Sequence, residues 1–112
     1  MQELCFVKDE TVTAGTSGKI SLGKLPIGYV YRVKRVEVHI QSGAAGNLEI
    51  ALYVGDTKII PDTGFFTSDL AKNISMAQKD LPEGAELFIW RNNKDAANNW
   101  RYAIIVDLQE II

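Results

Sequence analysis

The feature that most constrains this chain is an alternation of apolar and polar residues between positions 29 and 40. Side chains that alternate with a period of two lie on opposite faces of an extended strand, so the pattern predicts a half-buried β-strand. Apolar residues occupy odd positions up to Val33 and even positions from Val36 onward. A β-bulge at Lys34-Arg35 would keep both halves facing the core. We therefore expect a long bent strand with a bulge, a shape that lets one strand serve both sheets of a sandwich.

Further strands follow at regular spacing. Residues 48–54 alternate in the same way, and Gly55-Asp56 followed by a second apolar run is typical of a β-hairpin. The turn sequence at 81–84 precedes a compact strand at 86–90. The last predicted strand has five large apolar residues on one face, which we expect to face the core: Trp100, Tyr102, Ile104, Val106 and Leu108.

Residues 68–81 are the one ambiguous stretch. Leu70, Ile74 and Leu81 have helical spacing, whereas Ile74 and Met76 also fit a short strand. We favour a loop that leads into a short strand, because every neighbouring element is β.

Together these signals predict an all-β fold, an antiparallel β-sandwich of the jelly-roll type with about seven to eight strands, in a single domain over residues 1–112. The segment 1–24 is expected to be either a partly extended N-terminal arm or edge strands. No crossover helices separate the strands, which argues against a parallel α/β fold.

The composition narrows the function further. The chain has 112 residues and a formal net charge of -2, so wide neutralisation of nucleic-acid phosphates is not expected. Charges at residues 8–10 interrupt the N-terminal apolar run, which argues against a signal peptide, and no run approaches the ~20 apolar residues of a membrane span. We expect a protein that is made in the cytoplasm and does not enter a bilayer.

The residue types needed for catalysis are scarce. Cys5 is the only cysteine and lies in an apolar stretch, so we expect a small buried hydrophobe. His39 is the only histidine, which leaves no zinc site with two imidazoles or with Cys and His, and we expect it at the surface. The many carboxylates lie in turns without spacing that suggests a glycosidase pair or a calcium loop. Gly18-Lys19 does not have the spacing of a phosphate loop. The sequence thus predicts no enzyme, no metal and no cofactor.

Aromatic residues offer one alternative to a purely structural role. Tyr53 and Trp90, with Asn92 and Asn93 in a polar stretch at 92–99, could contact a sugar or a protein partner. The apolar end, Ile111-Ile112, is a second candidate contact, because such an end is unfavourable unless something covers it.

The order of these signals resembles small jelly-roll or β-sandwich proteins of virus particles, especially phage capsid decoration, vertex or spike-base proteins. The resemblance is carried by residues 33–40, by the strand and hairpin at 47–56, by the stretch 81–87 and by the closing strand from Asn98 to Tyr102, which together span most of residues 30–108.

This resemblance implies a virion protein without enzymatic activity that forms a homo-oligomer and docks onto a capsid or tail lattice. Its partners would be other protein subunits, with residues 1–24 and the Ile111-Ile112 end in contact with them. The alternative is a β-sandwich module that binds a carbohydrate or a cell-surface receptor.

Overall fold

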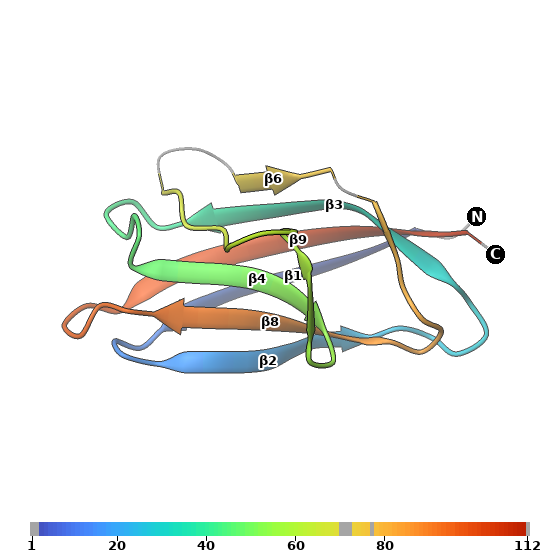
Figure 1. Ribbon diagram of the computed structural model, residues 1–112, viewed down its shortest axis with the longest axis horizontal. Coiled ribbons are helices and arrows are strands. Elements are labelled where there is room, and N and C mark those ends of the chain that lie inside the picture. Colours follow the sequence, from blue (N-terminus) through green and yellow to red (C-terminus); the bar gives the residue numbers. More distant parts are fainter. Residues whose placement is uncertain (1–2, 70–72, 77, 112) are drawn as a thin grey trace.

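The computed structural model describes residues 3–69, 73–76 and 78–111, and within them every regular element is a β-strand. Two antiparallel sheets pack face to face in a body of 46 × 23 × 22 Å (Figure 1). The prediction of an all-β antiparallel sandwich is therefore confirmed. The first sheet contains β1 (Glu3–Val12), β9 (Trp100–Glu110), β3 (Tyr31–Ile40) and β6 (Asn73–Ser75) in that order, with β7 (Lys79–Asp80) also paired to β3. The second contains β2 (Ser17–Lys24), β8 (Glu86–Asn93), β4 (Leu48–Val54) and β5 (Thr57–Ile60).

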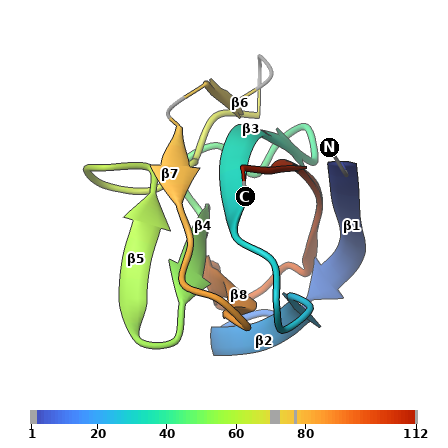
Figure 2. The same ribbon diagram turned by 90° about the vertical axis from the view of Figure 1, so that its right-hand side faces the viewer.

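The pairing order is that of a jelly roll. Since β6 and β7 both pair with β3, they act as one interrupted strand, and the described part of the chain then has eight strands. The first of these pairs with the last, the second with the seventh, the third with the sixth and the fourth with the fifth. This is the arrangement that results when one long hairpin is rolled into two sheets. Figure 2 shows the two sheets end on, with β1 and β2 together at one side of the sandwich.

The predicted bulge lies where the phase of the alternation changes. Val33 lies opposite Leu108 and Arg35 lies opposite Asp107, so that Lys34 is the extra residue. Val33 and Val36 are both fully buried, because the bulge restores the inward phase. The bulge is confirmed, but β3 belongs to the first sheet alone, so the expectation that it would serve both sheets was wrong.

The core lies between the sheets and follows the alternation of each strand. On β9 the residues Tyr102, Ile104, Val106 and Leu108 are all at most 1% exposed, as predicted for that face. On β4 and β8 the alternate residues Leu48, Ile50, Leu52, Leu87 and Ile89 meet them from the second sheet.

Several local predictions need correction. Cys5 is exposed rather than buried, because its side chain lies on the outer face of β1, between the inward-facing Leu4 and Phe6. The strand predicted at 86–90 continues to Asn93, since the ladder with β4 extends that far. Residues 1–24 supply β1 and β2, which lie at the edges of the two sheets. In the stretch 68–81, residues 73–75 and 79–80 are strands, while Leu70 lies outside the described residues.

Candidate interaction surface

The outward face of the first sheet, formed by side chains of β1, β9, β3 and β6, carries most of the exposed large apolar groups that lie on strands. One row crosses the sheet through Val7, Ile105, Glu37 and Ile74, which lie opposite one another. Val7 is 63% exposed and Ile74 is 44% exposed, and Met76 follows β6 with 65% of its surface exposed. We call this surface the first-sheet face.

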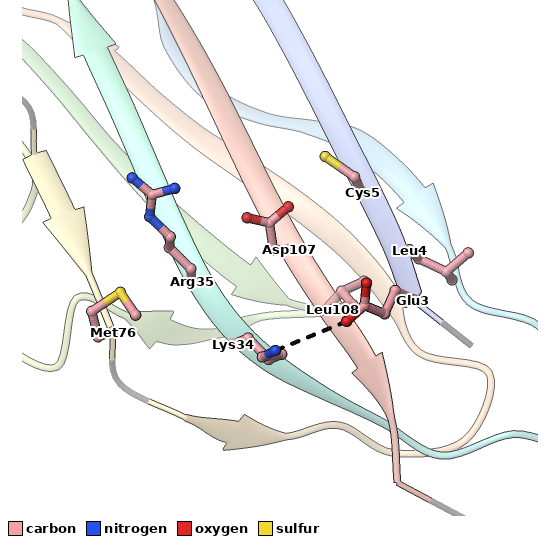
Figure 3. Close-up of a pocket in the computed structure, with 8 residues that line it drawn as sticks. All are labelled: Glu3, Leu4, Cys5, Lys34, Arg35, Met76, Asp107 and Leu108. Carbon is pink, nitrogen blue, oxygen red and sulfur yellow. Dashed lines mark ion pairs between the residues drawn. The ribbon is translucent and has the colours of Figure 1, made fainter. Parts of the chain in front are cut away.

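A groove of about 440 Å³ lies in this face beside the bulge. In Figure 3 three of its side chains, Cys5, Asp107 and Arg35, come from the adjacent strands β1, β9 and β3. Lys34 Nζ lies 4.0 Å from Glu3 Oε1 at one end of the groove. The bulge therefore shapes the face, because it places a second basic side chain next to Arg35. The lining residues are Glu3, Leu4, Cys5, Lys34, Arg35, Met76, Asp107 and Leu108.

The thiol in the groove is held in its protonated form. The partial shielding of the thiol, its hydrogen bond to Asp107 and the negative charge of that carboxylate raise the pKa of Cys5. A thiol needs a lowered pKa to act as a nucleophile or as a metal ligand at neutral pH. The groove is therefore a concave site with polar lining residues, but it does not activate the Cys5 sulfur.

Most of the charged side chains on the first-sheet face form ion pairs with one another. Glu37 is 7% exposed and accepts a hydrogen bond of 2.8 Å from Arg35 Nη2, and His39 Nε2 lies 3.0 Å from its other oxygen. Arg101 forms a two-point ion pair with Asp9 beside a second groove of about 340 Å³. His39 lines that groove as a partly exposed residue. Burial of these ion pairs against a partner would leave each of their charges with its counter-charge.

The second sheet brings together two residues predicted as ligand contacts. The rings of Tyr53 and Trp90 lie 6.4 Å apart at 40° on its outer side. Lys19 Nζ lies 5.4 Å from the centre of the Tyr53 ring and binds Asp56 at 2.6 Å. The indole N–H of Trp90 is buried and has no hydrogen-bond partner among the described residues. Lys19 Nζ therefore lies over the Tyr53 ring on the outer side of the second sheet.

Of the remaining candidate contacts, Asn92 follows Trp90 by two positions on the same face of β8, whereas Asn93 points to the opposite face. Asn92 and Asn93 belong to β8 rather than to a loop, and Asn92 binds Glu49 at 2.8 Å. Asn93 is 1% exposed, and its amide donates to the carbonyl oxygens of Val12 and Asn98 at 3.0 and 2.9 Å. Its side chain therefore supports the 94–99 loop and does not face a partner. Ile111 is half-buried and its backbone N–H donates to Val30, while Ile112 lies outside the described residues.

A charged cluster between the sheets has no counterpart in the sequence analysis. Arg91 on β8 is 9% exposed and binds both oxygens of Glu10 on β1, at 2.8 and 3.1 Å. Tyr102 Oη donates to the same carboxylate at 2.8 Å. Burial by itself raises the pKa of Glu10, but the hydrogen bonds from Arg91 and Tyr102 and the nearby positive charges outweigh it, so the pKa lies below its usual value. The only sign of this cluster in the sequence was one charged residue at an inward-facing position of β1, Glu10, and one of β8, Arg91.

Within the described residues, no three His, Cys, Asp or Glu side chains gather as they would around a metal ion. Over the same part of the chain, no helix has the length and apolarity to cross a membrane.

Comparison with known proteins gives information on the fold alone. No family model matches the chain, and no curated protein matches it. A chain in the structure of the infectious bursal disease virus Gt strain is similar over 96% of this chain and 30% of its own length, with a TM-score of 0.56 and 11% identity. A chain of the Gx strain is similar over 97% and 32%, with a TM-score of 0.49 and 12% identity. The periplasmic inhibitor of g-type lysozyme PliG from Aeromonas hydrophila covers 96% of this chain and 86% of its own length, with a TM-score of 0.42 and 12% identity.

The chain thus spans about a third of the virus chains to which it is similar. The Gt-strain match covers almost all of this chain, which agrees with the jelly-roll order of the strands. The resemblance to β-sandwich proteins of virus particles is confirmed as a resemblance of fold.

Proposed function

We propose that this protein is a structural component of a virus particle that acts without catalysis, by burying surface against other protein subunits. The observation that carries the proposal is the jelly-roll fold, which extends over 96% of the chain in the comparison with a virus structure. In its finer form, the proposal is a bacteriophage decoration, vertex or related assembly protein that docks onto a capsid or tail lattice.

The first-sheet face supports this role physically. It carries exposed apolar groups on β1 and beside β3, and most of its charges form pairs within the face. An interface core is favourable when apolar surface is buried and no ionised group loses its partner. A lattice subunit would therefore gain the most binding free energy by covering Ile74 and Met76.

The test is co-sedimentation of the purified chain with particles of the virus in whose genome its gene is found. We expect the wild-type chain to sediment with the particles at a fixed ratio to the main shell or tail protein. Ile74→Asp places a charge on the first-sheet face and should weaken attachment at least tenfold. Ile27→Asp is the matched control, because Ile27 is 76% exposed outside the sheets, and this variant should attach like the wild type.

Two results would contradict the proposal. One is a wild-type chain that stays in the supernatant at every particle concentration. The other is retention of the chain on polysaccharide gels that is lost in Tyr53→Ala. That result would favour a carbohydrate-binding or receptor-binding module, for which the close approach of the Tyr53 and Trp90 rings is the supporting observation.

A further inference from the structure

The sandwich has edge strands that differ sharply in how well they are protected from pairing with another chain. An exposed edge is usually blocked by shortness, by a bulge, by proline or by lysine side chains. β5 has 4 residues, and β6 and β7 have 3 and 2. β2 has a register shift between Ser21 and Gly23 and carries Lys19 and Lys24. These edges are poor templates for a further strand.

β1 lacks most of these devices. It has 10 residues without proline or glycine, and all of them pair with β9 in an uninterrupted register. Among the described residues no strand pairs with its other edge. Behind it the Phe6 ring packs against Gly23, where an added Cβ would lie only 2.7 Å from Phe6 Cε1. This contact covers the core behind β1. The backbone N–H and C=O groups of β1 that point away from β9 have no paired strand among the described residues.

From this geometry we propose that β1 pairs in antiparallel fashion with β1 of a second copy of this chain, around a twofold axis that passes through Val7. The first sheets of the two copies would then form one continuous sheet. Such a twofold contact is self-complementary, because the same residues serve both sides. The proposal goes beyond attachment to a lattice and does not depend on it.

The charges of β1 select this register. The first-sheet faces of the two copies lie on the same side of the joined sheet only if odd-numbered residues of one β1 lie opposite odd-numbered residues of the other. Centring on Val7 places Phe6 opposite Lys8 and Cys5 opposite Asp9, and it pairs the strand from Glu3 to Thr11 without any like charges in opposition. Val7, which is 63% exposed in the single copy, then meets its own counterpart.

The neighbouring registers are less favourable. Centring on Phe6 would place Glu3 opposite Asp9 at two symmetric positions, and centring on Lys8 or on Asp9 would oppose two identical charges. Like charges directly opposite one another destabilise an antiparallel pair. Centring on Cys5 avoids this but pairs only residues 3–7. The Val7 register is therefore the longest one that is free of like-charge contacts.

A cysteine cross-link tests this register directly. In a Cys5→Ser background, Val7→Cys should form a disulfide-linked dimer under mild oxidation, because directly opposite residues have Cβ atoms ~4.5–5.5 Å apart. The matched control is Thr11→Cys in the same background. In this register two copies of position 11 lie far apart at opposite ends of the pairing, and they should stay unlinked.

Light scattering of the isolated chain gives the second measurement. The wild type should show twice the monomer mass of 12.4 kDa. Val7→Lys should weaken dimerisation at least tenfold while the thermal transition stays close to that of the wild type, since Val7 is exposed. Ile27→Lys should remain a dimer. If Val7→Lys fails to fold, the cross-link decides.

A wild type that stays monomeric at all concentrations up to ~1 mM, or cross-linking as strong at position 11 as at position 7, would overturn the pairing. Neither result bears on lattice attachment, which the Ile74→Asp variant measures on a different strand. Conversely, a dimer that does not attach to particles would leave the β1 pairing intact and contradict only the proposed function.

Discussion

At the scale of single residues, the contact between Glu10, Arg91 and Tyr102 stands out because it joins the two sheets across the edge where β1 and β2 lie together. Arg91 is 9% exposed and also donates to the Gly18 carbonyl oxygen at 2.8 Å. Burial and the hydrogen bond to the Glu10 carboxylate raise the pKa of Tyr102, so its hydroxyl remains a donor at all ordinary pH values. Removing one member would deprive the others of a charge-assisted hydrogen bond at a site that is partly shielded from water.

Glu10→Gln should therefore destabilise the protein by about 2 kcal/mol at pH 7, the size typical of lost hydrogen bonds to a shielded charge. The pKa of Glu10 in the folded state lies below its ordinary value of 4.5, so its stabilising contribution is complete above that pH and is lost as the pH falls through the folded value. The difference between wild type and variant should accordingly narrow below about pH 4.5. Urea unfolding at several pH values measures this.

The matched control is Asp9→Asn on the neighbouring position of β1. Asp9 also forms a two-point pair with an arginine, Arg101, but this pair is exposed and solvent screens it. We expect a clearly smaller loss for Asp9→Asn than for Glu10→Gln at pH 7. Equal losses would show that the inter-sheet pair has no special role.

At the scale of elements, the bulge in β3 adds one residue to the strand while Val33 and Val36 on either side of it stay in the core. Lys34 is the extra residue, and without it Val33, Arg35 and Val36 would follow a regular alternation. Lys34 forms no backbone pair in the ladder and makes only a long contact of 4.0 Å with Glu3. The bulge therefore serves the shape of the first-sheet face more than the core.

Deletion of Lys34 should be tolerated, with a change in unfolding free energy of about 1 kcal/mol or less, since the inward phase of both halves of β3 is kept. Deletion of Glu37, three positions away, should unfold the protein or greatly weaken it, because Val38 and Ile40 would turn outward. Circular dichroism with thermal unfolding compares the two. Similar damage from both deletions would mean that the bulge itself is needed for folding.

At the scale of the whole molecule, the rolled hairpin brings the first and last strands together. Glu3 lies opposite Gln109 at the end of the β1–β9 ladder. Figure 1 shows β1 and β9 side by side. Every strand pair apart from the β4–β5 hairpin joins segments separated by long stretches of sequence. The turn at Gly55-Asp56 is exposed and joins only the strands of that hairpin.

A circular permutant should test whether this architecture depends on the order of the strands along the chain. We expect that joining the ends with a short glycine-serine linker and opening the chain between Gly55 and Asp56 preserves cooperative unfolding, because all strand pairs remain possible. A permutant opened between Glu37 and Val38 is the control and should lose cooperativity, since it interrupts β3. Loss of folding in the first permutant would show that the β4–β5 hairpin must form as a continuous unit.

The features of the fold that could be predicted from the sequence are those that depend on the local alternation of apolar and polar residues. The alternation at 48–54 and 100–108 predicted β4 and the buried face of β9, and the phase change at Lys34-Arg35 predicted the bulge. Each of these is a local property, because the side-chain period of a strand is set by its own backbone. For Cys5 the same reasoning failed, since an apolar neighbourhood does not say which face of an edge strand points inward.

The amino-acid sequence by itself thus determined that the chain forms an all-β sandwich and where its strands turn. Only the tertiary structure decided which strands are neighbours, which lie at the edges, and which side chains meet. Arg91 and Glu10 are 81 residues apart and come together because β1 and β8 lie in different sheets of one roll. Asn93 is 1% exposed, and its amide donates to the Val12 carbonyl oxygen at the end of β1, a contact that also spans 81 residues. Such contacts depend on the packing of distant strands, about which the local alternation of residues carries no information.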